Sequence, residues 1–392
     1  MQLATRMERV PPYIFASVAR EIRAREAQGA HITNLGIGSP DLPPPDFIVE
    51  AMAAAMREPA SHRYPGYTGL PELREAIAVY YARRFGVQLD PNRQVIPLIG
   101  SKEGTANIAA ALVDPGDLVL VPDPGYPTYA MGTVLHDGEV YSMPLTAEHG
   151  FLPDLDAIPR AIYERAVAMW LNYPNNPTGA VAPIEFYAQV VALAKKYGFV
   201  VLSDNPYAEI TFDGYRGPSF LEAPGAMDVA LEFNSLSKTY NFAGERVGMA
   251  VGNATLVEAL TRVKSNVDTG IFVPIQRGAI AALTGPQEWI AERNKIYQLR
   301  RDLAVAGLRA VGFDVATPKA ALYVWPRVPA GWEAADLAMK LLDEAQVWMT
   351  PGTAFGPSGD GYMRAALCTE ADEMVRAFDR VARVMSSEGS NG

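Results

Sequence analysis

Short apolar segments alternate with helical patterns between residues 94 and 255, and this alternation restricts the fold more than any other feature of the sequence. Alternating strands and helices form a mostly parallel sheet with helices wound over both faces. The apolar segments contain few polar residues, which is typical of strands buried on both sides. The predicted strands lie at 95–99, 117–122, 138–145, 166–174, 199–204, 228–234 and 247–252.

The pattern changes after about residue 280, where a long helical segment precedes short strands and a final helix. We expect an α+β arrangement there, and 392 residues are more than one domain usually holds. A helix predicted at 12–29 is expected to join this part. The sequence therefore predicts a large domain at 46–280 and a discontinuous small domain at 1–45 and 281–392. The predicted small-domain elements are helices at 287–312 and 371–385 and strands at 321–328 and 347–350.

Composition excludes several classes of protein. The net charge of −10 argues against nucleic acid or an anionic membrane as partner, because both need a basic surface. The sequence contains no stretch of about 18 apolar residues, so no membrane span is expected. The single cysteine, Cys368, fits a reducing cytoplasm. The four histidines are scattered and do not suggest a metal site.

Lys238 lies in the stretch FNSLSKTYNFAGERVGMA, which covers residues 233–250. A lysine amine condenses with a carbonyl only when unprotonated, so burial or a nearby positive charge must lower its pKa. Ser235, Ser237 and Arg246 are good donors to a phosphate. A reactive lysine beside a phosphate site is what pyridoxal phosphate (PLP) needs. Taken alone, the stretch also fits a polar loop with one solvated lysine.

The segment GSKEGTAN, residues 100–107, follows the first predicted strand and opens a predicted helix. Ligands of open α/β sheets bind beyond the carboxyl ends of the strands. Backbone N–H groups at a helix start can hold an anion, and Ser101, Lys102 and Thr105 would surround a phosphate there. A simple capped helix start explains this motif equally well.

Four more polar side chains follow predicted strands. Tyr126, in PDPGYPTY, could lie flat over an aromatic ring. Asn176, in NYPNNPTG, and Tyr207, in SDNPYAE, could reach a ring oxygen. Asp204 ends an apolar strand, where a carboxylate is costly unless paired, and a protonated pyridine nitrogen would pair with it. Singly, these residues also fit a packed loop tyrosine, an Asn-Pro turn and a surface aspartate. Together with Lys238 and the phosphate donors at Ser101, Ser235 and Arg246, they supply every contact PLP needs.

The chain resembles the PLP-dependent aminotransferases with the aspartate aminotransferase fold, over nearly its whole length. The motifs that carry this resemblance are SLSKTYNFAGERVG, NNPTG, SDNPY, GYPTY, YPGYTGLPELREAI and PGTAFG followed by YMRAAL. It implies that Lys238 holds PLP and moves a proton during transfer of an amino group between an amino acid and a 2-oxo acid.

The resemblance also implies further roles. Arg364 should bind the substrate α-carboxylate through a bidentate fork, and the Gly38 backbone should approach the same group. Tyr126 and Asn176 should contact substrate as well as cofactor. Tyr64 should reach the phosphate of the partner subunit's cofactor, which requires a homodimer with shared active sites.

Substrate choice is less constrained. Relatives specific for dicarboxylates place a partner arginine against the substrate side chain, and residues 265–276 contain none. The segment is similar to the branch with LL-diaminopimelate aminotransferases and broad aspartate, alanine and aromatic aminotransferases. We expect glutamate and 2-oxoglutarate as one substrate pair. The alternatives are a PLP-dependent lyase acting at Cβ or Cγ and, less favoured, a non-enzymatic PLP-sensing regulator.

Overall fold

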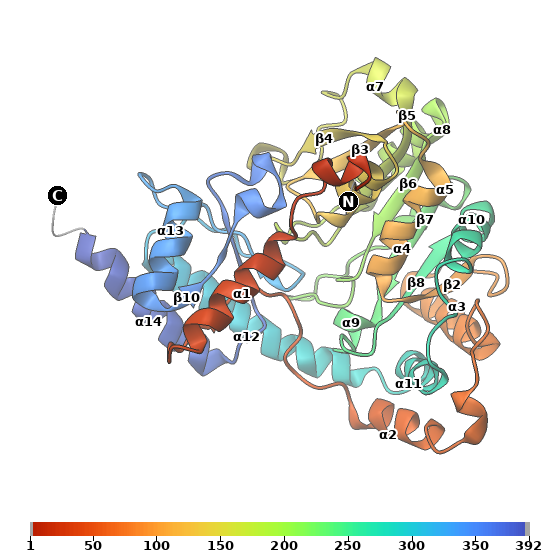
Figure 1. The fold of residues 1–392 in the computed structure, drawn as a ribbon, viewed down its shortest axis with the longest axis horizontal. Coiled ribbons are helices and arrows are strands. Elements are labelled where there is room, and N and C mark those ends of the chain that lie inside the picture. The colour runs from red at the N-terminus through yellow and green to blue at the C-terminus, as the bar shows by residue number, and fades with distance from the viewer. Residues whose placement is uncertain (1–2, 389–392) are drawn as a thin grey trace.

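A seven-stranded sheet forms the centre of the larger part of the molecule (Figure 1). The computed structural model describes residues 3–388. The strand order is β2-β8-β7-β6-β5-β3-β4, and β8 alone runs antiparallel to its two neighbours. The predicted mostly parallel sheet is confirmed. Its strands are β2 (Val95–Ile99), β3 (Leu118–Asp123), β4 (Glu139–Pro144), β5 (Ala166–Asn172), β6 (Val200–Asp204), β7 (Ala230–Ser235) and β8 (Val247–Gly252).

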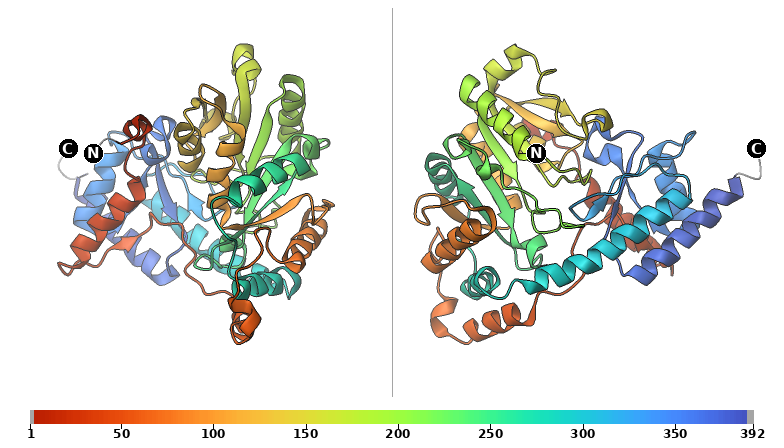
Figure 2. Two further views of the ribbon diagram at one scale, coloured as in Figure 1. Left: turned by 45° about the vertical axis from the view of Figure 1, so that its right-hand side comes forward. Right: turned by 180° about the vertical axis from the view of Figure 1, so that it is seen from behind.

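Helices cover both faces of this sheet (Figure 2). One face carries α4 (Ser101–Asn107), α5 (Ala109–Leu112), α6 (Thr128–Leu135) and α10 (Ala254–Lys264). The other carries α3 (Pro71–Phe85), α8 (Ile184–Tyr197) and α11 (Val273–Thr284), and α2 (Asp46–Ala55) packs on α11. The short α7 (Arg160–Arg165) precedes β5, and the single turn α9 (Leu236–Thr239) follows β7. Left-handed glycines end α3 and α8, at Gly86 and Gly198.

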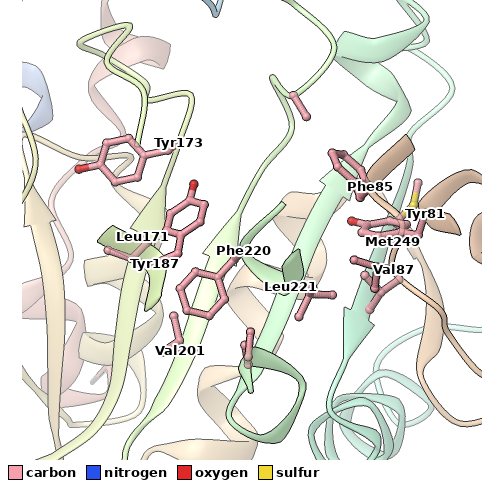
Figure 3. Packing of buried hydrophobic residues seen from close by; sticks show 14 of the residues in the cluster. Tyr81, Phe85, Val87, Leu171, Tyr173, Tyr187, Val201, Phe220, Leu221 and Met249 are labelled. Atoms are coloured by element: carbon pink, nitrogen blue, oxygen red, sulfur yellow. The ribbon is translucent and has the colours of Figure 1, made fainter. Parts of the chain in front are cut away.

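Successive strand residues point to opposite faces, so one strand serves two cores. In β5, Met169 and Leu171 join the cluster under α3, α8 and α11, and Ala168 and Trp170 join the other. Figure 3 shows part of the first cluster, where Phe220 lies near Tyr187 and Val201. This two-sided burial explains why the strands read as continuous apolar runs.

The smaller part of the molecule has a core of its own. It joins residues 22–35 to residues 297–384, with Tyr207, Ile210 and Phe212 packed against them. Strand β1 (Thr33–Asn34) pairs with β10 (Val347–Trp348), and β11 (Thr350–Pro351), β12 (Met363–Ala366) and β9 (Tyr323–Val324) form a second sheet. Its helices are α1 (Ile14–Glu26), α12 (Glu288–Ala310), α13 (Ala334–Lys340) and α14 (Ala371–Glu388).

Short turns complete the chain. They are 3₁₀ segments at Thr5–Arg9 (η1), Pro59–His62, Ala147–His149, Phe220–Glu222, Ala226–Asp228, Gly352–Phe355 and Pro357–Gly359, and a π turn at Leu341–Ala345. Turn η1 docks on the far end of α6, where Arg6 donates to Leu135 O at 2.9 Å and pairs with Asp137 at 3.3 Å. The N-terminal segment therefore contacts both parts of the molecule.

The exact division at 45/46 and 280/281 stays a prediction, and residues 1–2 and 389–392 of the predicted small domain lie outside the described residues. Three element predictions need correction. The single strand expected over 347–350 is divided at Met349 into β10 and β11, which belong to different sheets. The helix expected over 101–113 breaks at Ile108 into α4 and α5. The strand expected over 321–328 covers only Tyr323–Val324, because Pro326 has no N–H to give to a ladder. Among residues 3–388, no helix is long and apolar enough to cross a membrane.

Candidate active site

A cavity of about 420 Å³ lies beyond the carboxyl ends of β5, β6 and β7, between the two parts of the molecule. This is where ligands of open α/β sheets are expected. It gathers almost every residue that the sequence analysis proposed. Those that line it are Gly38, Ser101, Lys102, Thr105, Tyr126, Asn176, Asp204, Tyr207, Ser235, Ser237, Lys238, Arg246 and Arg364.

Lys238 lies in the single turn α9, directly after β7. The Ser235 side chain caps this turn by accepting from the Ser237 N–H at 3.2 Å. The Lys238 amine donates to the Gly38 carbonyl at 2.7 Å. Burial lowers the pKa of this amine to about 8, and the positive charges of Arg364 and Arg246 act in the same direction. The amine is thus easier to deprotonate than an ordinary lysine.

Asp204 is buried at the end of β6, with 5% of its surface exposed. The Tyr129 hydroxyl donates to Oδ2 at 2.6 Å, while Oδ1 has no hydrogen-bond partner among the described residues. Burial raises the pKa of this carboxyl to about 7; the Tyr129 hydrogen bond opposes the shift and the charge of Glu232 adds to it. A buried carboxylate with one open oxygen calls for a cationic partner.

Several donors face one another where α4 begins. Gly100 has φ +72°, and a Cβ there would lie 2.1 Å from a terminal nitrogen of Arg246. Only glycine therefore lets the Arg246 guanidinium lie against the start of α4. Arg246 also donates to the Ser237 hydroxyl at 3.4 Å. The main chain at the start of α4, the hydroxyls of Ser101, Ser235 and Ser237 and the Arg246 guanidinium together form an anion-binding corner.

Arg364 reaches the cavity from β12 and is 3% exposed. Its Nη1 donates to Asn176 Oδ1 at 2.7 Å and Nη2 donates to the Gly36 carbonyl. The Tyr323 ring lies 4.4 Å from the guanidinium carbon. This guanidinium is therefore fixed in direction by groups from both parts of the molecule.

Aromatic side chains form a further part of the cavity wall. The Tyr207 and Tyr323 hydroxyls are 2.7 Å apart, and the Tyr126 and Tyr129 rings meet edge to face at 5.7 Å. Lys102 lies 4.5 Å from the centre of the Tyr13 ring. A planar ligand would find both apolar faces and hydroxyl donors here.

Tyr64 is the one proposed site residue that lies outside the cavity; it is 87% exposed. The sequence analysis missed Tyr13, Tyr129 and Tyr323, which line the cavity. Tyr129 lies three residues after Tyr126 in the same PDPGYPTY motif, so that motif could have pointed to it. No local pattern marks the other two.

Comparison with known proteins decides the family. A family model described as aminotransferase class I and II matches residues 30–381. The chain belongs to this family. The aminotransferase is 50% identical over 385 residues to an LL-diaminopimelate aminotransferase of Moorella thermoacetica, covering 98% of this chain and 99% of that one.

Solved structures agree on the fold of the aminotransferase. Substrate-bound BacF from Bacillus subtilis superposes with a TM-score of 0.95, at 37% identity and 98% coverage of both chains. Aspartate aminotransferase from Thermus thermophilus with maleate gives 0.92, at 30% identity, covering 98% of this chain and 100% of that one. The predicted fold class and the predicted transfer of amino groups are confirmed.

Proposed function

We propose that this aminotransferase uses pyridoxal phosphate, bound in the cavity around Lys238. The observation that carries the proposal is the buried Asp204 carboxylate, which lines the cavity that also holds the Lys238 amine and whose Oδ1 accepts no hydrogen bond among the described residues. A protonated ring nitrogen would supply the charge that this oxygen lacks. The residues present fit the cofactor at its ring, its aldehyde and its phosphate.

The other contacts follow from the donors on hand. Ser101, Ser235, Ser237 and Arg246, with the start of α4, would hold the phosphate. Tyr126 would cover the ring, Asn176 and Tyr207 would bond its oxygen, and Lys102 would lie at the cavity wall beside Tyr126.

When bound, PLP supplies an aldehyde that condenses with amines and a ring that withdraws electrons from the substrate Cα. The protein supplies position and proton transfer. Arg364 binds the substrate carboxylate, and its contacts with Asn176 and Gly36 fix its direction. The Lys238 amine takes the proton from Cα of the amino donor and, in the second half of the cycle, gives a proton to Cα of the new amino acid, which its lowered pKa favours near neutral pH.

For the substrates, we propose LL-diaminopimelate as amino donor and 2-oxoglutarate as acceptor. The names of relatives at about 50% identity support this choice, as does the absence of arginine from residues 265–276. A panel of donors with 2-oxoglutarate tests it. Strong turnover with aspartate, alanine or aromatic donors and none with diaminopimelate would instead support the broad-range reading.

We also propose a homodimer with shared active sites, working in the cytoplasm. The exposure of Tyr64 supports the first part, because a phosphate ligand from this position must act outside its own subunit. The single cysteine supports the second.

The substitution Lys238→Ala tests the central role. It should abolish the visible absorbance of the cofactor-bound protein and lower kcat by at least about 10³-fold, since both the covalent attachment and the proton carrier are lost. Lys264→Ala removes a buried lysine outside the cavity and is the control. Turnover at the wild-type rate in Lys238→Ala would refute the assignment.

A further inference from the structure

The turn α9 leaves main-chain carbonyl groups that need partners, because a helix end has no intrahelical donors for them. A single side chain serves two of these. Nη1 of Arg293 donates to the Lys238 carbonyl at 2.5 Å and to the Thr239 carbonyl at 2.6 Å. Nη2 donates to the Glu209 carbonyl at 2.8 Å. One planar fork thus binds the peptide unit of Lys238 itself and the segment that follows Tyr207.

Arg293 comes from α12, the long helix that runs from beside α11 into the smaller part of the molecule (Figures 1 and 2). It is 2% exposed. Among the described residues it has no carboxylate partner within ion-pair distance, and burial lowers its pKa to about 10. Arg301 of the same helix is buried to a similar degree but pairs with Asp213.

A buried charge without a carboxylate is costly, so its geometry must be supported by what it binds. Here the ligands are carbonyls of the reactive turn and the neighbouring Asn294 side chain. Two turns further along α12, Arg300 binds Asp41 with both terminal nitrogens, at 2.8 and 2.9 Å. Asp41 lies three residues after Gly38, and the Gly38 carbonyl accepts a hydrogen bond from the Lys238 amine. One helix therefore holds the main chain of Lys238 and the loop that its side chain touches.

We propose that Arg293 is a positioning residue, which fixes the α9 turn so that the Lys238 amine stands at the reacting carbon. The proposal rests on the assignment of Lys238 as the cofactor lysine. Arg293 does not line the cavity, so substitution should affect the lysine rather than substrate binding. A misplacement of about 1 Å can cost about 10²-fold in rate.

Arg293→Met and Arg301→Met form the test pair, since each removes one buried guanidinium of α12. We expect Arg293→Met to lower kcat by about 10²-fold with KM for the amino acid within about twofold of wild type. Arg301→Met should leave kcat within about twofold. Arg293→Lys keeps the charge but not the fork, so kcat should fall by at least about tenfold; it also decides the question should Arg293→Met fail to fold.

A second readout uses the cofactor-free proteins. Acetic anhydride labelling, followed by peptide mass spectrometry across pH, reports the titration of the Lys238 amine. In Arg293→Met the midpoint should move up from about 8 toward 10.5, because the released turn exposes the amine to water. Labelling of Lys264, which is 1% exposed, should not change; a general loosening of the fold would raise it too.

Wild-type labelling and kcat in Arg293→Met, or in Arg293→Lys where only that variant folds, would overturn the proposal. So would equal changes in Arg301→Met, because they would reflect lost packing of α12. Borohydride fixation of PLP on the wild type separates this failure from that of the proposed function. Attachment to a lysine other than Lys238 would contradict the proposed function, whereas attachment to Lys238 with unaffected variants would contradict this inference alone.

Discussion

Asp204 carries the electrostatic cost of the site at the scale of single residues. Its carboxyl is buried, one oxygen is bound by Tyr129, and the other is open. A buried carboxylate with one unpaired oxygen destabilises the cofactor-free protein when it is ionised, and it strengthens the binding of a ligand that brings a positive charge. Asp204 thus lowers the stability of the cofactor-free protein and raises its affinity for a cationic ring.

Asp204→Asn should reveal this cost. In the folded protein the pKa is about 7, raised from 3.8, so the native state binds the extra proton and loses stability as pH rises from 3.8 to 7. The melting temperature of cofactor-free Asp204→Asn, relative to that of wild type, should therefore rise between pH 3.8 and 7 and remain higher above pH 7. Its kcat should fall by about 10²–10³-fold. A constant difference in melting temperature from pH 4 to 8 would contradict the electrostatic account.

Gly100→Ala should weaken cofactor binding. The new Cβ would displace the Arg246 guanidinium, and a lost charge-assisted bond of about 1.5–3 kcal/mol corresponds to about 10- to 100-fold in Kd for PLP. Gly86→Ala also forces a positive φ, of +71°, but its Cβ would meet no atom within 4 Å. It should lower stability and leave the affinity unchanged. Equal affinities for both variants would refute the steric argument.

Residues at strand ends were predictable because turn-forming motifs mark them. Asn176, Asp204 and Lys238 each follow an apolar run, and parallel strands end at one edge of a sheet. Tyr13 and Tyr323 were not predictable, since a lone tyrosine has no pattern that tells a core position from a cavity wall. Tyr323 lies two residues after Ala321, which has φ +70°, and nothing in the sequence AALY predicts this left-handed conformation.

At the scale of elements, the short strand β1 is joined to α14 by one acidic side chain. Glu373 accepts from the Thr33 hydroxyl and from Arg376 and Arg380. Burial opposes ionisation, but these hydrogen bonds prevail and lower its pKa to about 2, from 4.5. Strand β1 is thus hydrogen-bonded to α14 through Glu373, and it pairs separately with β10.

Glu373→Gln should cost about 1–2 kcal/mol of unfolding free energy at pH 6, measured in urea. Because the folded pKa is the lower one, this stabilisation is present above pH 4.5 and is lost as pH falls toward 2. The difference between the proteins should therefore narrow at acid pH. Glu344→Gln, which breaks an exposed pair with Lys340, should change little. A difference independent of pH would contradict the role of charge.

The strands and helices of the large sheet could be predicted because helices cover both of its faces and most of its strands are apolar runs. The edge strand β4 is the exception, since Met143 is its only buried residue. The smaller part was harder to predict. Its strands are two to four residues long, so long-range pairing, and not a local pattern, determines them.

At the scale of the whole molecule, shared active sites can be tested by complementation. Lys238→Ala and Tyr64→Ala should each be impaired alone. After unfolding and refolding of an equal mixture, half of the dimers would be mixed, and each would hold one site with Lys238 and the partner subunit's Tyr64 intact. Activity should then reach about a quarter of wild type. Activity no higher than the mean of the separate variants would indicate that Tyr64 acts within its own subunit.

The N-terminal segment gives the assembly a further property. Turn η1 is fastened to α6 through Arg6, helix α1 belongs to the second core through Ile22, and Tyr13 stands between them at the cavity. Because the segment is held by the larger part at η1 and by the smaller part at α1, its middle depends on the position of both parts. Any change in the separation of the two parts would therefore shift Tyr13 and alter the shape of the cavity wall that it forms.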